Sequence, residues 1–472
     1  MGNLSIQLFI VSAYIVLLFG ISFYVKHRAD KGSTEYLFAG RKLTTGLIAV
    51  NITGLAVGAA STVGVAERAY NIGMAAGWYN AAWSVGAVFM GLFAAGKYRS
   101  LKATTIPELF ERYYDTKGRL IAALGLVIIM LVITSLQYLA GGAILSALLP
   151  DVFSFKGGML TSAVVFIGIT LIGGLWSSGL SNIVSVFLIY AGVLYSAFTA
   201  IGNAGGMAKI EATLPNAAQM LSPIAGLPLS AIFAMFAVMI TQAITAQGPV
   251  QIACGAKDAK TARNGFLCGA ALIFPIGFLC AILGIVCKVS FPGIAPTMAL
   301  PKVVMSLNPW ASGATLAAMW AADVSTACTI LLAAGTLFAQ DIYKRFLNPH
   351  VSDKNFVAIN RLTIFACGLI TLWFAFNAAG ILKTMLAGLS MTAPLTVIFL
   401  FTVFAPQFCK KNAAFYTTLV GLLGIVAWQY IPALHVFKDV IYFEWVICVI
   451  TFFLVYFIDP TPIKEPEFIE ED

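Results

Sequence analysis

Charge is scarce in this chain of 472 residues: 10% of its residues are Asp, Glu, Lys or Arg, against about 25% in soluble domains. Histidine is rarer, with three residues that all lie near predicted loops (His27, His350 and His435). The sequence has no GxxxxGK[ST] phosphate loop, no HExxH motif and no nucleophile–base pair. These absences argue against an ATP-driven pump and against an enzyme, and we expect no organic cofactor.

The cysteines also lack a pattern. Eight are spread through apolar segments without CxxC spacing or histidine partners, so we expect buried free thiols and no metal or redox site. The formal net charge of +8 comes from basic residues in loops beside apolar runs, so we expect no nucleic-acid partner.

Hydrophobic residues are abundant, at 60% of the chain. Many apolar runs exceed the roughly 20 residues that cross a bilayer core. The first run has its positive charge after it and no cleavage signal, so we interpret it as a retained helix. We therefore predict an all-α integral membrane protein with about thirteen spans in one domain. The predicted spans are 5–26, 44–70, 74–97, 119–149, 156–176, 180–203, 228–254, 263–289, 312–340, 356–376, 380–405, 413–431 and 440–458.

Lys and Arg concentrate in alternate loops. The rich loops are 26–43, 97–119, 255–263 and 341–361, followed by the pair Lys410–Lys411. Because cytoplasmic loops carry the excess of Lys and Arg, we place these loops inside. The N-terminus is then outside and the acidic tail 464–472 inside, in a multi-pass protein of the cell membrane (plasma or inner).

Two of the predicted spans contain helix-breaking residues. Span two places Gly54, Gly58 and Gly64 near the bilayer centre, and span seven contains the pair Gly248-Pro249. Carbonyls freed by a break need a partner in protein, water or a cation. The two spans are five apart, which predicts two five-helix repeats of opposite orientation with a binding site at the breaks. The alternative is that small residues only allow close helix packing.

Span nine carries polar residues on one helix face. Ala322, Ser325 and Thr326 stand at i, i+3 and i+4, so they share a face. Two hydroxyls and a carbonyl, met by carbonyls of a broken helix, form a neutral oxygen site that suits a monovalent cation, whereas a divalent ion favours carboxylates. The alternative is that both hydroxyls bond to carbonyls of their own helix.

Three stretches resemble the sodium:solute symporter family, which includes bacterial proline, galactose, sialic acid and pantothenate symporters. They are Glu35–Arg41, Thr105–Tyr113 and the segment from Ala322 to Thr326 that continues to Gln340–Arg345. The resemblance covers nearly the whole chain, with these stretches in order and at matching spacing.

The resemblance implies a leucine-transporter-type inverted repeat of five plus five helices. Repeat one would cover about 44–203 and repeat two about 228–405, with extra helices at 5–26, 413–431 and 440–458. It also implies sodium-coupled symport of a small organic solute, with sodium as the coupling ion. The sodium ligands would be Gly54, Val57, Ala322, Ser325 and Thr326.

Two positions depart from the family. Many members carry an aspartate where this chain has Asn182, whereas Asp323 stands where relatives usually have an apolar residue. A carboxyl group inside the membrane is a functional candidate by default. Asp323 and Asn182 are the candidate positions for a second cation or a proton. Asp323 could also pair with a substrate amine, or it could be a neutral acid in helix packing.

The substrate is expected beside the sodium site. The candidate substrate-binding residues are Ala56, Ala60, Ser61, Asn80, Gln137, Tyr138, Gln242 and Gln247. Sugar-transporting relatives have larger polar groups at two of these positions, so we expect an amino acid, a small carboxylate or a similar metabolite. Trp78, Tyr79 and Trp83 could gate the site or only pack. The alternatives are a proton-coupled carrier that uses Asp323, or a transporter-like sensor or channel. The oligomeric state is left open, and a monomer is compatible with the sequence.

Overall fold

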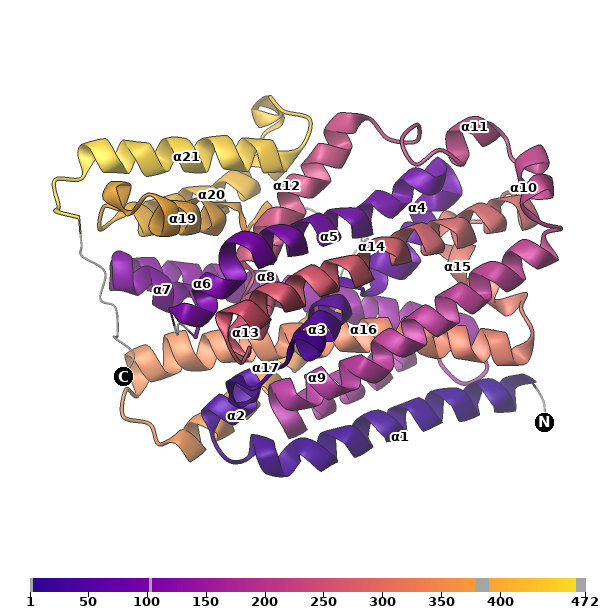
Figure 1. Ribbon diagram of the computed structural model, residues 1–472, viewed down its shortest axis with the longest axis horizontal. Coiled ribbons are helices and arrows are strands. Elements are labelled where there is room, and N and C mark those ends of the chain that lie inside the picture. Colours follow the sequence, from indigo (N-terminus) through magenta and orange to yellow (C-terminus); the bar gives the residue numbers. More distant parts are fainter. Residues whose placement is uncertain (1–2, 102–103, 378–389, 464–472) are drawn as a thin grey trace.

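The computed structural model describes residues 3–101, 104–377 and 390–463. Over these ranges the regular structure is helical, and the extended pairing consists of two isolated bridges. The predicted all-α class is therefore confirmed. Most helices run roughly along the long axis of the molecule (Figure 1), and α1 begins at the end of that axis opposite to the end where α21 finishes.

The bounds of the helices follow the chain. The first half contains α1 (Asn3–Ala29), α2 (Ser33–Phe38), α3 (Thr45–Ala56), α4 (Val65–Ile72), α5 (Trp78–Phe89), α6 (Ala95–Ser100), α7 (Ile106–Tyr113), α8 (Thr116–Leu148), α9 (Phe155–Asn203), α10 (Met207–Thr213) and α11 (Ala217–Met220). The second half contains α12 (Leu229–Thr245), α13 (Gln247–Cys254), α14 (Ala259–Ser290), α15 (Ala299–Met305), α16 (Pro309–Leu337), α17 (Asp353–Asn377), α19 (Ala393–Phe404), α20 (Ala413–Tyr430) and α21 (Val440–Ile458).

Eight helices in the described ranges are long and apolar enough to cross a membrane, or up to ten if each of two bent pairs counts as one span. The predicted count of thirteen is higher for identifiable reasons. The predicted spans 156–176 and 180–203 are joined in α9, and the third span continues from the second with short turns. Part of the span predicted at 380–405 lies outside the described residues. The count of thirteen stays a prediction.

A sharp turn at Gly174 divides α9. Its φ of 53° and ψ of −137° are not helical, and a β-carbon at this position would stand 2.2 Å from the carbonyl oxygen of Tyr36. Both the positive φ and the close approach require glycine. The turn comes a few residues before the predicted boundary at 176–180, because the sequence there has no charge or proline to mark it.

Helix α16 lies at the centre of the bundle and is buried along its whole apolar window. It starts with Asn308, whose side chain accepts a hydrogen bond from the amide of Ala311, and with Pro309 in the first turn. These are favourable residues for a helix N-terminus. The helix packs against α9, α8, α1 and α17, so every face of it contacts protein.

A row of glycines on α14 lets neighbouring helices approach closely. Gly265 and Gly269 face Ile48 and Ile52 of α3, and Gly284 faces the carbonyl oxygen of Ala66. Small residues of this kind allow helix backbones to pack closely in membranes. Helix α14 thereby holds α3, α4 and α5 together.

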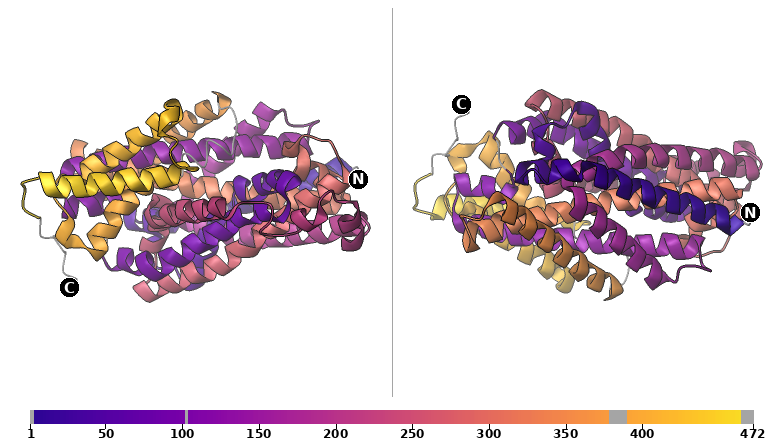
Figure 2. Two further views of the ribbon diagram at one scale, coloured as in Figure 1. Left: turned by 90° about the horizontal axis from the view of Figure 1, so that it is seen from above. Right: turned by 90° about the horizontal axis from the view of Figure 1, so that it is seen from below.

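The last three described helices, α19, α20 and α21, form a separate layer at one end of the molecule (Figure 2). Gly421 of α20 packs against Pro394 of α19 and Cys448 of α21. The eight cysteines are free thiols; seven are buried, as predicted, whereas Cys268 of α14 is exposed.

Candidate functional site

The first break in a membrane helix follows α3. Helix α3 ends at Ala56, and Val57 has a non-helical ψ of 79°. The chain resumes at Ala60 as a wide turn of π-helix. The Ser61 hydroxyl donates to the Ala56 carbonyl oxygen at 2.6 Å, which satisfies one carbonyl freed by the break. The break predicted in span two is therefore present.

The second break separates α12 from α13, which are bent by 47°. Ala246 is extended (φ −78°, ψ 141°), and Pro249 is the third residue of α13, where its missing amide is not needed. The Tyr98 hydroxyl donates to the Ile244 carbonyl oxygen at 3.0 Å. The break predicted from Gly248-Pro249 is therefore present, a few residues earlier than the pair itself.

The hydroxyl face of α16 meets the first break. The Ser325 hydroxyl donates to the Gly54 carbonyl oxygen at 2.8 Å and to that of Ala322 at 2.9 Å. The Thr326 hydroxyl lies 2.9 Å from the Gly54 oxygen and 3.1 Å from that of Leu55. The structure thus gathers neutral oxygens from two helices that are distant in sequence. We call this group the α3–α16 oxygen cluster, formed by Gly54, Leu55, Ala322, Ser325 and Thr326.

Four of the five predicted sodium ligands belong to this cluster. Val57, the fifth, lies at the first non-helical position of the break, and its amide donates to the Thr53 carbonyl oxygen at 2.8 Å. The Leu55 carbonyl was not predicted, because any residue can supply a carbonyl and the sequence carries no signal for it. The donor set consists of uncharged oxygens, which fits a monovalent cation.

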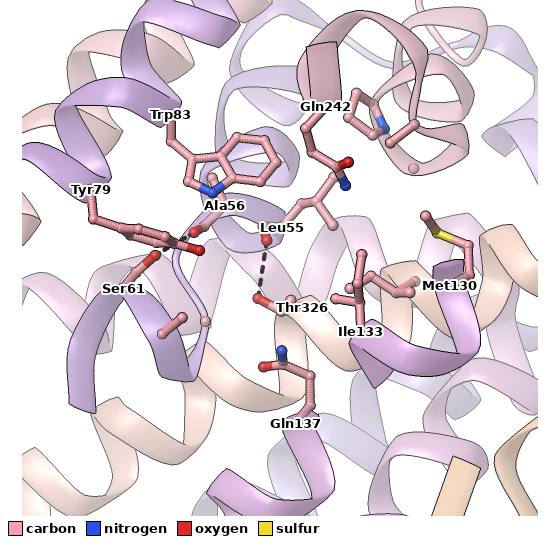
Figure 3. Close-up of a pocket in the computed structure, with 16 residues that line it drawn as sticks. Leu55, Ala56, Ser61, Tyr79, Trp83, Met130, Ile133, Gln137, Gln242 and Thr326 are labelled. Carbon is pink, nitrogen blue, oxygen red and sulfur yellow. Dashed lines mark hydrogen bonds between the residues drawn. The ribbon is translucent and has the colours of Figure 1, made fainter. Parts of the chain in front are cut away.

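A small cavity adjoins the cluster through Leu55 and Thr326 (Figure 3). The space open to the centre of a water molecule is ≈ 30 Å³, which is room for about two waters. Its lining residues are Leu55, Ala56, Gly58, Ala60, Ser61, Tyr79, Trp83, Met130, Ile133, Gln137, Gln242, Ala246, Gly248, Pro249, Thr326 and Ile330. Both helix breaks contribute to this lining, so the cavity lies between them, where the substrate is predicted to bind.

Five of the eight predicted substrate residues line the cavity: Ala56, Ala60, Ser61, Gln137 and Gln242. The side-chain oxygens of Gln137 and Gln242 are buried and have no hydrogen-bond partner within the described part of the chain. They are therefore acceptors available to a ligand.

The other three lie elsewhere. Asn80 packs against Gly277 of α14. Tyr138 stacks on Phe166, with ring centroids 5.5 Å apart. The Gln247 amide donates to the carbonyl oxygen of Thr104 at 3.1 Å. None of the three lines the cavity.

Several lining residues were not predicted as substrate contacts. Met130 and Ile133 precede Gln137 by seven and four residues on α8, so helical spacing from Gln137 could have identified them. Tyr79 and Trp83 were considered as gates; both line the cavity, and Figure 3 shows them together on one side of it.

Asn182 and Asp323, the two positions at which this chain departs from the family, have different neighbours. The Asn182 amide donates to the Asn51 side-chain oxygen at 3.1 Å, and Asn182 borders Gly54 closely. Asp323 is fully buried, borders Gly141 of α8 and has no hydrogen-bond partner in the described ranges.

An ion-pair network lies outside the cavity, where α7 meets α8 and the π-helical segment Phe338–Leu347 that follows α16. Arg119 contacts Asp341 at 2.7 Å and Glu111 at 2.6 Å, and Arg345 contacts Glu111 at 2.8 Å. Burial would raise the pKa of Glu111, but hydrogen bonds from Arg345 and Arg119 outweigh it and lower this pKa to about 2. The network fixes α7, and the carbonyl oxygen of Thr104, two residues before this helix, accepts a hydrogen bond from Gln247.

Known proteins resemble this chain in sequence and in fold. The sequence profile of the sodium:solute symporter family matches residues 36–421. The chain is 24% identical to the sodium/glucose cotransporter of Vibrio parahaemolyticus, over 76% of this chain and 73% of that protein. It is 23% identical to the sodium/proline symporter of Escherichia coli, over 88% of this chain and 87% of that protein.

Among solved structures, the substrate-bound outward-open form of a sodium-coupled sialic acid symporter superposes with a TM-score of 0.84. It has 18% identity and covers 98% of this chain and 99% of that one. This likeness shows that the two chains share one fold. The family profile covers most of the chain, and this chain belongs to the sodium:solute symporter family.

Proposed function

We propose that this chain couples sodium entry to uptake of a small organic solute by alternating access. Sodium-coupled symport of a small solute follows from the family. The finer parts of the proposal are the solute, which we take to be an amino acid, a small carboxylate or a similar metabolite, and the residues that bind it. The observation that carries the proposal is the convergence of Ser325, Thr326 and the Gly54 carbonyl beside a cavity at two helix breaks.

Sodium would be held by the α3–α16 oxygen cluster together with Val57. In the structure the two hydroxyls donate to carbonyls of α3. With a cation present, the hydroxyl protons turn away and both kinds of oxygen face the ion. The ion then joins α3 to α16 more strongly than the hydrogen bonds do, because every oxygen in the set contacts one positive charge.

The solute would bind between the two breaks, in contact with Ser61, Gln137 and Gln242. The cavity has room for about two waters, so the helices that surround it must move apart to admit a solute. Sodium binding that favours one arrangement of α3 and α16 raises solute affinity, and by linkage the solute raises sodium affinity equally. The membrane potential adds roughly 2.3 kcal/mol per charge per 100 mV.

The proposal includes a topology. The thirteen spans comprise repeats at about 44–203 and 228–405, with the N-terminus outside and the C-terminus in the cytoplasm. The basic loops support this orientation. This topology places the network of Glu111, Arg119 and Asp341 on the cytoplasmic side.

The test is solute uptake into proteoliposomes, after a thermal-stability screen of amino acids and small carboxylates in sodium and in potassium. A transported ligand should stabilise the protein in sodium and much less in potassium. Thr326→Ala should raise the sodium concentration needed for half-maximal uptake by about tenfold or more, the loss of one ion ligand. Thr363→Ala is the matched control, because that hydroxyl bonds to its own helix at Ile359. Unchanged sodium dependence in Thr326→Ala refutes the assigned site.

A further inference from the structure

A second, larger cavity lies along the same helix as the central one. It has a volume of ≈ 670 Å³ and is bounded by α12 and by the α20–α21 connection. We call it the α12–α20 cavity. Met235 and Val238 of α12 line it, and Gln242, one turn further along, lines the central cavity. The two cavities therefore follow one another along α12, and the predicted topology places the larger one on the outer side.

The walls of the α12–α20 cavity combine cations with apolar surface. Arg68 of α4 and Lys438 contribute positive charge, and Asp439 contributes one carboxylate. Ile425 and Trp428 of α20 continue the apolar wall formed by α12. One carboxylate thus faces two side chains that are cationic at neutral pH.

Arg68 is the group that needs a partner. It is partly buried, and in the described portion of the chain it has no hydrogen bond or salt bridge within bonding distance. Asp439 attracts it at longer range, and the positive charge of the adjacent Lys438 also acts on Asp439. Glu67 does not line the cavity, because adjacent residues of a helix project about 100° apart. A guanidinium group offers five donors in a fork that fits a carboxylate.

We propose that the α12–α20 cavity is a binding site for an organic monocarboxylate, held by Arg68 at its carboxylate and by the α12–α20 wall at its apolar part. Arg68 supplies paired hydrogen bonds to the anion, and Lys438 adds charge. Met235, Val238 and Ile425 exclude a bare, strongly hydrated anion in favour of one with a hydrocarbon body. The site precedes the central cavity on the way in and does not require sodium.

The test uses the purified full-length chain in potassium buffer without sodium. The probes are phenylacetate and butyrate, each compared with its uncharged amide at constant ionic strength, and the readouts are thermal stabilisation and tryptophan fluorescence. Both carboxylates should bind saturably and both amides at least tenfold more weakly, because only the anion forms charge-assisted bonds with Arg68.

The variants are Arg68→Gln and Arg68→Lys, with Lys209→Gln on the exposed helix α10 as the charge-matched control. Arg68→Gln should weaken carboxylate binding about tenfold. Arg68→Lys, which keeps the charge and loses the fork, should weaken it less, and the control should leave it unchanged. Equal binding of acid and amide, or undiminished carboxylate binding in Arg68→Gln, would overturn the proposal. Because no sodium is present, these outcomes are independent of whether uptake proves to be sodium-coupled.

Discussion

The Ser325 hydroxyl lies 2.8 Å from the carbonyl oxygen of Gly54, a residue 271 positions earlier in the chain. One partner belongs to the first half of the chain and the other to the second half. The contact therefore reports on the relative position of the two proposed repeats, and changes at either residue should alter sodium dependence and stability together.

The first prediction concerns Gly54. A β-carbon there would stand 2.7 Å from the side chain of Asn182, so Gly54→Ala must either turn that side chain away from its hydrogen bond with Asn51 or shift α3 against α9. We expect a loss of about 1–3 kcal/mol of stability, as for other overpacked sites, and weaker sodium binding. Gly46→Ala is the control in the same helix, since nothing lies within 4 Å of its β-carbon. Thermal unfolding in a sodium titration measures both effects, and equal behaviour of the two variants would contradict the close packing at Gly54.

The second prediction concerns the turn inside α9. Gly174→Ala places a β-carbon 2.2 Å from the Tyr36 carbonyl oxygen in a backbone conformation with positive φ. We expect a severe loss of folded protein, seen as a low monodisperse yield in detergent. Gly202→Ala, in the same helix with open space around it, should be neutral or slightly stabilising. A normal yield of Gly174→Ala would show that α9 turns elsewhere.

The third prediction concerns pH. The pKa of Glu111 is lowered from 4.5 to about 2, so its ionised form is favoured in the folded state. Its stabilisation is complete above pH 4.5 and is lost as pH falls toward 2. The difference in melting temperature between the parent and Glu111→Gln should therefore shrink over this interval. Glu211→Gln, on the exposed helix α10, is the control. A pH-independent difference would argue against the ion pairs with Arg119 and Arg345.

The fourth prediction is that two glutamines near the second break, Gln242 and Gln247, have different roles. Gln242 lines the central cavity, whereas the Gln247 amide is bonded to Thr104 outside it. Gln242→Ala should weaken solute binding by roughly tenfold, the loss of about one hydrogen bond in a closed site. Gln247→Ala should retain solute affinity and loosen α7. Binding titrations in sodium measure the first effect, and proteolysis near Thr104 measures the second. The opposite ranking would mean that the site lies on the other side of the break.

Sequence patterns were sufficient to predict the two helix breaks and the hydroxyl-bearing face of α16. Glycine, proline and the i, i+3, i+4 spacing of Ala322, Ser325 and Thr326 have local structural consequences. They could not show that Asn80 and Tyr138 lie outside the lining of the cavity in this conformation, because the directions of these side chains depend on which neighbouring helix packs against them. Their role as substrate contacts stays a prediction. The patterns also could not identify Leu55 as a carbonyl donor, because that role comes from backbone position alone. The boundary predicted near the turn at Gly174 was a few residues late, because the need for glycine there arises from contact with Tyr36, 138 residues away, which no local pattern reports.

The glycines of α14 have a consequence for motion. Gly265, Gly269 and Gly284 have no side chains, so at their contacts with the neighbouring helices there are few side chains that could change rotamer. The four helices α3, α4, α5 and α14 should therefore shift as one stiff block. The deformation then falls on the boundary with α16, where hydroxyl–carbonyl pairs can separate at a modest energetic cost of about 1 kcal/mol each. The most easily separated contact of this block is therefore the one between α3 and α16, where a cation would bind. A single bound ion can then determine whether these two helices stay together or move apart.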